Sequence, residues 1–163
     1  MSDPHDRTVT VVTVFCVLIH EGRVLMIRRG RPPYQGARTV PGGHKLHGES
    51  LRQACAREMA EETGLLVGEL KFAGYMEVVF PGDDRDFLSF YFTCDRYSGE
   101  LRAEGPEGQV YWAGIAEAPE LPTAHPAFRA LAPYFLHGRG PFEARAVVDA
   151  DGRGQYQVTL MGE

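Results

Sequence analysis

The stretch GHKLHGESLRQACAREMAEETGL, residues 43–65, decides how the rest of this chain is expected to fold. It opens with a glycine and continues into a predicted helix that begins at Ser50. Ser50 and Gln53 have the spacing of a capping box, in which each side chain bonds the backbone N–H of the other residue. Gly64 suits the left-handed position that ends a helix, so we expect the helix to end near Thr63.

Three glutamates, Glu58, Glu61 and Glu62, stand at positions i, i+3 and i+4 of this helix. The spacing places them on one face, where like charges repel by about 0.2–0.5 kcal/mol per pair. A bound cation would turn this repulsion into attraction, and oxygen ligands favour Mg²⁺ ahead of Mn²⁺. The alternative interpretation is a solvated acidic face that binds nothing.

The pattern resembles the signature of the Nudix hydrolases. That signature combines glycines, an Arg-Glu pair, a Glu-Glu pair, a separate glutamate and aliphatic residues at fixed intervals. This sequence matches every fixed position, at Gly43, Glu49, Arg57, Glu58, Met59, Glu61, Glu62, Gly64 and Leu65. A looser similarity in the order of elements, including the lead-in Pro41-Gly42-Gly43, covers residues 8–136.

The resemblance implies a Mg²⁺-dependent hydrolase, with Mn²⁺ as the second choice of metal. Glu58, Glu61 and Glu62 are expected to bind the metal together with the backbone carbonyl of Gly42. The general base varies among relatives of this kind. Here Glu58 is the first candidate, Glu61 the second, and a glutamate outside the signature the third.

Two further residues of the signature, Glu49 and Arg57, are expected to support the site rather than react. A buried arginine can pair with Glu49 and hold the preceding loop against the helix. Such pairing orients ligands without touching the metal. We therefore predict a Glu49–Arg57 ion pair.

Glu107 lies outside the signature and precedes Trp112 in a predicted loop. The resemblance implies a further acidic ligand or base near this point, and we assign that role to Glu107. Glu104 is the competing candidate. The alternative interpretation is an exposed loop carboxylate without a role.

Substrate contacts are predicted from residue type alone. Arg28 and Arg38 are the candidates for phosphate, together with Arg29 and Arg31, although solvated surface explains any one of them better. Phe80 is the candidate for stacking on a base, ahead of Tyr34, Phe87 and Trp112, although aromatic residues of this kind more often belong to the core. The histidines His44, His47, His125 and His137 are assigned no metal or catalytic role.

The pattern along the chain predicts an α/β fold, an α/β/α sandwich around a mixed sheet, as in Nudix domains. We read residues 1–163 as one domain, with a polar tail at 1–7. Predicted strands cover residues 8–20, 23–29, 67–80, 86–94 and 109–115, with a break at Gly74 as an alternative for the third, and residues 95–99 are a turn. A second helix is predicted at residues 127–136, with Phe128, Leu131 and Phe135 in the core, and residues 141–160 form a hairpin within a C-terminal extension, 141–163.

Composition limits the partners that this chain is expected to have. The net charge of 17 − 22 = −5 argues against a general nucleic-acid binder. The apolar run at residues 9–19 is too short to cross a bilayer as a helix, so no membrane association is expected. Three widely spaced cysteines, Cys16, Cys55 and Cys94, indicate buried free thiols and a cytoplasmic location. A homodimer is left open.

The substrate is expected to be a nucleoside diphosphate linked to a further group. We favour a nucleoside triphosphate of the MutT type, with 8-oxo-dGTP as one candidate, which would yield a monophosphate and pyrophosphate. ADP-ribose or another conjugate is the alternative, because Pro81 lies where many ADP-ribose pyrophosphatases carry a proline. A non-catalytic nucleotide-binding module is less favoured, because no signature glutamate has been lost.

Overall fold

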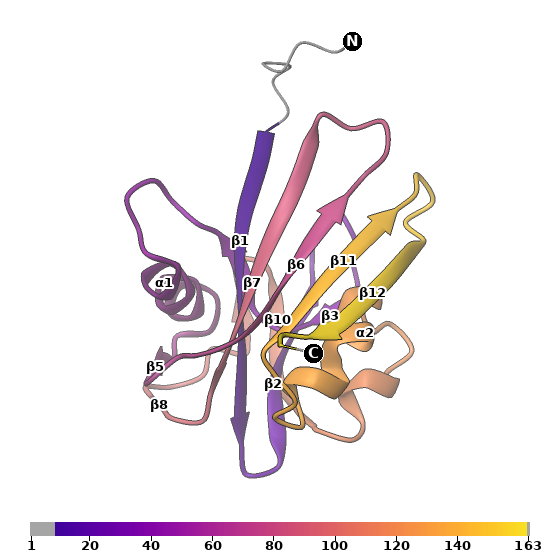
Figure 1. Cartoon of the computed structure of the whole chain (residues 1–163). Coiled ribbons are helices and arrows are strands. Elements are labelled where there is room, and N and C mark those ends of the chain that lie inside the picture. The colour runs from indigo at the N-terminus through magenta and orange to yellow at the C-terminus, as the bar shows by residue number, and fades with distance from the viewer. Residues whose placement is uncertain (1–8, 163) are drawn as a thin grey trace.

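Alternating side chains on the longest strand, β1 (Val9–His20), point to two separate hydrophobic cores. Val14, Cys16 and Leu18 are buried beneath α1 (Leu51–Thr63), whereas Val17 is buried beneath α2 (Pro126–Phe135). The period of two along a strand explains this division. In the computed structural model, which describes residues 9–162, one helix therefore covers each face of the sheet, as Figure 1 shows. The predicted α/β/α sandwich is confirmed.

The large sheet is mixed and has the strand order β12-β11-β6-β7-β1-β2-β10-β9. The pairs β1–β7 and β6–β11 are parallel, and the other neighbouring pairs are antiparallel. The strands that follow β1 are β2 (Arg23–Arg29), β3 (Arg38–Thr39), β4 (Gly42–His44), β5 (Leu66–Val67), β6 (Lys71–Val79), β7 (Arg85–Cys94), β8 (Tyr97–Ser98), β9 (Glu104–Gly105), β10 (Gly108–Gly114), β11 (Phe142–Val148) and β12 (Gly154–Leu160). A short 3₁₀ turn, Ala118–Glu120, precedes α2.

The sheet opens between β1 and β2. These two strands pair only beside their hairpin, at Ile19 with Val24 and at His20 with Arg23. Further along, β4 pairs with β1 and β3 pairs with β2, so the chain before α1 enters the gap. The gap connects the face that carries α1 with the face that carries α2.

The ends of α1 follow the predicted capping pattern. The Ser50 hydroxyl accepts a bond from the Gln53 backbone N–H at 3.1 Å, and the Gln53 side chain accepts one from the Ser50 N–H at 2.8 Å. Gly64 has φ +79°, a left-handed conformation that favours glycine. The predicted start and end of this helix are confirmed.

Two predictions about the middle of the chain were wrong. The strand expected at residues 67–80 is split into β5 and β6, a division that was not predicted, whereas the register of β6 shifts between Phe72 and Gly74, next to the break considered at Gly74. Residues 95–99 are not only a turn, because they contain β8, which pairs with β5 in a separate two-stranded sheet. These short strands bond to each other beside the end of α1, a long-range pairing that local sequence does not encode.

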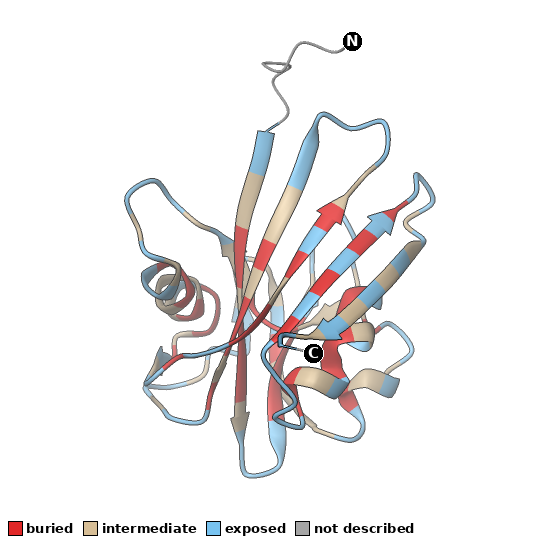
Figure 2. Ribbon diagram, in the orientation of Figure 1, coloured by how far each residue is buried: buried red, intermediate tan, exposed pale blue. Residues whose placement is uncertain are grey.

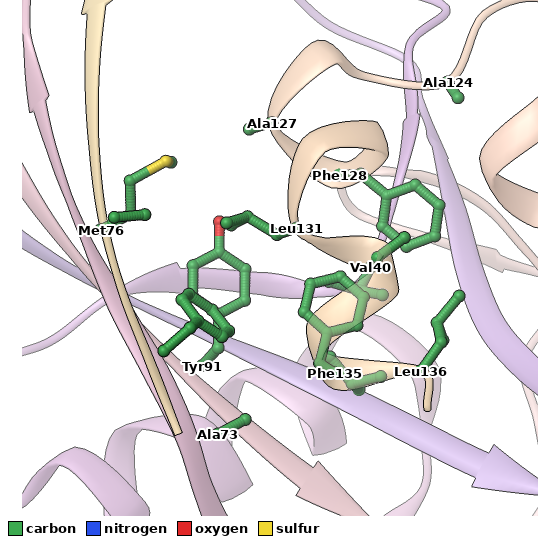
Figure 3. Close-up of a cluster of buried hydrophobic side chains, with 14 of the residues drawn as sticks. Val40, Ala73, Met76, Tyr91, Ala124, Ala127, Phe128, Leu131, Phe135 and Leu136 are labelled. Atoms are coloured by element: carbon green, nitrogen blue, oxygen red, sulfur yellow. The ribbon is translucent and has the colours of Figure 1, made fainter. Parts of the chain in front are cut away.

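The core beneath α2 is rich in aromatic rings. Phe128, Leu131 and Phe135 of α2 are buried as predicted, and Tyr91 of β7 stacks on Phe135 with ring centroids 5.8 Å apart. Figure 3 shows these side chains between the helix and the sheet. The three cysteines are buried, unbridged and part of the opposite core beneath α1, as expected.

The C-terminal hairpin, β11 with β12, extends the large sheet instead of projecting from it. β11 runs parallel to β6 from Phe142 to Val147. Buried and exposed residues alternate along β11, as Figure 2 shows, because one face packs on the core and the other meets solvent. The predicted hairpin is confirmed, whereas the predicted N-terminal tail lies outside the described residues. Within residues 9–162, neither helix is long and apolar enough to cross a membrane.

Candidate active site

A cleft of about 610 Å³ lies on the α2 face of the sheet, beside the gap between β1 and β2. Its lining comes from the loop after β2, from β1, β4, α1, β6 and β7, from the turn before β10, and from the last two strands. Two glutamates of α1 reach the cleft past Gly42 and Gly43, where the absence of side chains leaves room. A Cβ on Gly42 would overlap the Phe15 ring and the Val14 carbonyl.

The three predicted metal ligands on α1 have different surroundings. Glu58 and Glu62 line the cleft, whereas Glu61 does not. The side chain of Glu61 is 57% exposed and lies 3.1 Å from an Arg57 nitrogen. The role of Glu61 as a metal ligand or general base therefore stays a prediction. In that role its side chain would have to turn from Arg57 toward the cleft.

Glu62 is the most buried of these carboxyls, with 4% of its surface exposed. Its Oε2 accepts a hydrogen bond from the Gly42 backbone N–H at 3.3 Å. Burial, followed by the charges of Glu58 and Glu107, raises the pKa of Glu62 to about 8. Among the described residues, no positively charged side chain bonds Glu62. A bound cation would therefore stabilise its carboxylate form.

Glu58 lies between Arg57 and the glycine turn. Burial raises the pKa of Glu58, and the neighbouring Arg57 guanidinium opposes that rise. A Cβ on Gly43 would overlap the Glu58 carboxyl group, so only glycine leaves this group its place. The close approach of the Glu58 carboxyl group to the backbone thus explains the glycine at the first position of the signature.

The predicted Glu49–Arg57 ion pair is present. Arg57 donates to both oxygens of Glu49 and also to the His44 backbone carbonyl, at 2.9 Å. It further donates to Glu58 and Glu61, at 3.1 Å each. The expectation of a buried arginine was wrong, because the side chain is 23% exposed and the pair lies at the edge of the site.

Glu107 lies in the tight turn between β9 and β10 and lines the cleft, whereas Glu104 lines a separate hollow. Gly105 explains the placement, because it packs against the Glu62 backbone carbonyl so closely that a Cβ would overlap it. The turn therefore rests on the end of α1, and the charge of Glu107 acts on Glu62. Of the two candidates, the geometry favours Glu107.

These groups fit a divalent cation. The carboxyl groups of Glu58, Glu62 and Glu107 line the cleft together with Gly42, and oxygen ligands of this kind suit Mg²⁺ or Mn²⁺. Within residues 9–162 no three acidic, histidine or cysteine side chains converge into a finished metal cage. The carboxyl groups of Glu58 and Glu61 are instead each paired with Arg57, at 3.1 Å.

The predicted phosphate-binding arginines, Arg28 and Arg38, do not line the cleft. Arg28 faces the separate hollow, and Arg38 is bonded to the Tyr111 hydroxyl at 2.8 Å and to Thr123 at 2.9 Å. Arg29 lines the cleft instead. Arg29 was among the arginines considered from the sequence, where nothing distinguished it from Arg28, Arg31 and Arg38.

The far end of the cleft is aromatic. The predicted candidates Phe80, Phe87 and Tyr34 line it, whereas Trp112 packs beside His20 and Tyr97 in the α1-side core. Pro81 does not line the cleft. Two lining residues, His125 and Tyr156, received no role from the sequence, because neither lies in a motif and only the folded chain brings them here.

His125 caps the start of α2. Its Nδ1 accepts a hydrogen bond from the Ala127 backbone N–H at 3.1 Å, so the ring proton belongs on Nε2. Burial, and secondly the charge of Arg29, lowers the pKa of His125 to about 4. The ring is therefore neutral near pH 7 and can donate one hydrogen bond. Of the other histidines, His44 lines the cleft and His47 and His137 do not.

Comparisons with known proteins agree with this geometry. The sequence matches the NUDIX domain family over residues 9–135. It is 29% identical over 128 residues to an uncharacterized Nudix hydrolase of Bacillus subtilis, covering 77% of this chain and 78% of that one. It is 30% identical over 118 residues to an ADP-ribose pyrophosphatase of Methanocaldococcus jannaschii, with coverage of 70% and 68%.

Two further comparisons concern the oxidised-nucleotide branch and the fold. An oxidized purine nucleoside triphosphate hydrolase of Danio rerio is 33% identical over 103 residues, with coverage of 63% of this chain and 65% of that one. The crystal structure of a MutT protein from Bacillus halodurans superposes with a TM-score of 0.82 at 24% identity, covering 91% of this chain and 97% of that one. The family match, the intact glutamate signature and the shared fold together show that this chain belongs to the Nudix hydrolases and is a pyrophosphohydrolase of that family.

Proposed function

We propose that this enzyme cleaves the pyrophosphate bond of a nucleoside triphosphate in a Mg²⁺-dependent reaction and releases a monophosphate and pyrophosphate. The observation that carries the proposal is that one cleft is lined both by charged groups and by aromatic rings. We call the part lined by Glu58, Glu62, Glu107 and Arg29 the charged end, and the part lined by Tyr34, Phe80, Phe87 and Tyr156 the aromatic end. A nucleotide has the same division, with phosphates at one end and a flat ring at the other.

Each residue at the charged end has a part in this proposal. Glu58, Glu62 and the Gly42 backbone would hold a divalent metal, which when bound would supply positive charge to the phosphates. Arg29 pairs with a phosphate oxygen, a geometry that suits its guanidinium fork. Its Nε already donates to the Pro33 carbonyl at 2.9 Å, which fixes the side chain near the cleft.

Glu107 is the general base of the proposal, with Glu58 as the second candidate. It lines the cleft and bonds no arginine or lysine side chain among the described residues, so its carboxylate is available to a water molecule. Burial raises the pKa of Glu58, but its carboxyl group is already bonded to Arg57, whose guanidinium opposes that rise. A general base must lie within hydrogen-bond reach of the water molecule that attacks phosphorus.

ADP-ribose is the second candidate substrate. It is favoured by the similarity to the Methanocaldococcus jannaschii enzyme, which matches a longer stretch than the oxidized-purine hydrolase does. Both substrates place a pyrophosphate beside a nucleoside. The same charged end would serve either one, and the far end of the cleft would distinguish them.

A nucleotide screen with product analysis tests the proposal. The purified enzyme with Mg²⁺ is given the common nucleoside triphosphates, 8-oxo-dGTP and ADP-ribose in ¹⁸O-labelled water, and products are identified by chromatography and mass spectrometry. We expect monophosphate and pyrophosphate from a triphosphate, and activity about 10³-fold lower in Glu58→Gln. Preferential cleavage of ADP-ribose, or release of orthophosphate from triphosphates, would contradict the proposed reaction.

A further inference from the structure

The C-terminal hairpin contributes two residues, Val148 and Tyr156, to the wall of the cleft. The match to the NUDIX domain family ends at residue 135, before this hairpin begins at Phe142. Part of the cleft wall therefore comes from a segment outside the matched domain. The position of the hairpin in the sheet explains how it reaches the cleft.

Strand register places Tyr156 in a row across four strands. Tyr156 pairs with Ala146, Ala146 with Val78, and Val78 with Phe87. Paired residues share one face of a sheet, so Tyr156 and Phe87 lie on the same face. Phe80 contacts Phe87 edge to face, with ring centroids 5.6 Å apart. Tyr156, Phe80 and Phe87 thus belong to one aromatic end.

A second row marks the charged end. Gly42 pairs with Phe15, and Phe15 pairs with Tyr91 of β7. Tyr91 and Phe87 are four positions apart on β7, which corresponds to about 13 Å at about 3.3 Å per residue. The rows are also displaced across the sheet, because Gly42 lies two strand pairings from β7 and Tyr156 lies three pairings from it on the other side. Residues of both rows line one cleft, so a ligand with its phosphates at the carboxylates can extend its base toward Tyr156.

Neighbouring contacts fix the Tyr156 ring in this position. A Cβ on Gly154 would lie 2.8 Å from the Tyr156 hydroxyl, so the ring leans along the strand over a residue that has no side chain. At the hairpin turn, a Cβ on Gly152 would lie 3.8 Å from the Tyr34 ring. Tyr34 in turn meets His125 edge to face at 4.6 Å. Three segments distant in sequence enclose the aromatic end.

The chemistry of this end suits a neutral ring with polar edges. Its charged side chain, Arg85, is already paired with Asp83 at 3.3 Å. Burial and the nearby Tyr34 raise the pKa of Tyr156, so its hydroxyl stays protonated and can donate. His125 is a neutral donor through Nε2, for the reason given above. A nucleobase combines a flat apolar face with carbonyl and ring-nitrogen acceptors at its edge.

We propose that Tyr156 is a specificity-determining residue that contacts the nucleobase, and that the C-terminal hairpin is part of the substrate site. The proposal rests on the proposed nucleotide hydrolysis. Tyr156 acts on binding and choice of base, and takes no part in cleaving the bond.

Steady-state kinetics of Tyr156 variants test this role. For the preferred nucleotide, Tyr156→Ala should raise KM about tenfold, in line with the loss of one base–aromatic contact, and leave kcat within about twofold. Tyr156→Phe should keep the stacking and change the ratio of kcat/KM between bases. Gly154→Ala should also raise KM, because its Cβ displaces the ring. Gln157→Ala, on the exposed face of the same strand, is the matched control.

Inorganic tripolyphosphate separates base contacts from phosphate contacts. Its inhibition constant should be the same in the wild type and in Tyr156→Ala, because it has no base. Melting temperatures show whether each variant is folded. The inference is overturned if folded Tyr156→Ala keeps the wild-type KM for every nucleotide, or if nucleotide and tripolyphosphate weaken equally.

The experiment also distinguishes this inference from the proposed function. If the wild type cleaves ADP-ribose but no triphosphate, the proposed reaction fails and the Tyr156 variants are compared on ADP-ribose. If it cleaves no nucleotide, calorimetric titration with AMP and GMP decides the inference. Binding that weakens about tenfold in Tyr156→Ala supports the inference, and unchanged or absent binding overturns it.

Discussion

At the residue scale, carboxyl groups of one site differ because their surroundings differ. Glu62 is buried beside other acids and has its pKa raised to about 8, whereas Glu49 is paired with Arg57 and has its pKa lowered. Environments that separate pKa values in this way assign different roles to chemically identical groups. Glu62 is poised to accept a cation, and Glu49 is fixed as an anion that holds the arginine.

Replacing Glu107 tests the general base. We expect Glu107→Gln to lower kcat by about 10²-fold or more, because the amide cannot take a proton from water. Glu104→Gln is the matched control, since Glu104 lies in the preceding strand and outside the cleft. Single-turnover rates at saturating nucleotide and Mg²⁺ make the comparison. Equal losses in the two variants would remove the assignment from Glu107.

The buried His125 predicts how stability depends on pH. Its pKa falls from 6.5 to about 4 on folding, because burial disfavours the charged ring. Between these values the unfolded chain binds more protons than the folded one, so stability falls as the pH falls through this window. His125→Asn should keep a capping acceptor and lose this dependence. The decrease in melting temperature from about pH 7 to about pH 5 should be several degrees larger in the wild type than in the variant.

At the element scale, Arg57 ties α1 to the loop before it. It bonds Glu49 and the His44 carbonyl on the loop side and two glutamates on its own helix. A guanidinium fork can satisfy these partners together, and an ammonium group cannot. The signature arginine is thus a clamp on the elements that carry Gly42, Gly43 and Glu58.

Removing this clamp should affect stability as well as activity. We expect Arg57→Gln to lower the melting temperature by several degrees in EDTA, because Glu49 and Glu58 lose a shared partner. Arg57→Lys should fall between Arg57→Gln and the wild type. Thermal melts paired with kinetics in Mg²⁺ make the measurement. A variant that is inactive yet as stable as the wild type would indicate that Arg57 contacts substrate directly.

At the scale of the whole molecule, the acidic end of the cleft predicts metal dependence. Activity should vanish in EDTA and return with Mg²⁺ or Mn²⁺. Binding to the folded state alone also stabilises it, so Mg²⁺ at about 100 times its Kd should add about 2.7 kcal/mol of stability. Glu62→Gln should weaken this stabilisation, which calorimetry detects independently of turnover. Full activity in chelated enzyme would contradict the site described here.

The fold class and the charged end of the site followed from the sequence by itself. A helix with glutamates at i, i+3 and i+4, a capping box and a terminal glycine are local features, fixed by backbone geometry over a few residues. The apolar run at residues 9–19, rich in valine and threonine, likewise indicated a buried strand. Such patterns depend on neighbours in the chain, so they can be read without coordinates.

Tertiary structure decided which side chains complete the site. Arg29 lines the cleft in place of Arg28, which faces a separate hollow, and of Arg38, which is bonded to Tyr111 and Thr123. Glu107 was separated from Glu104 by the close packing of Gly105 on α1, and Tyr156 reached the cleft through the pairing of β11 with β6. Each of these contacts joins segments far apart in the chain. Sequence determined the chemistry that this protein carries, and long-range packing determined which residues share one cleft.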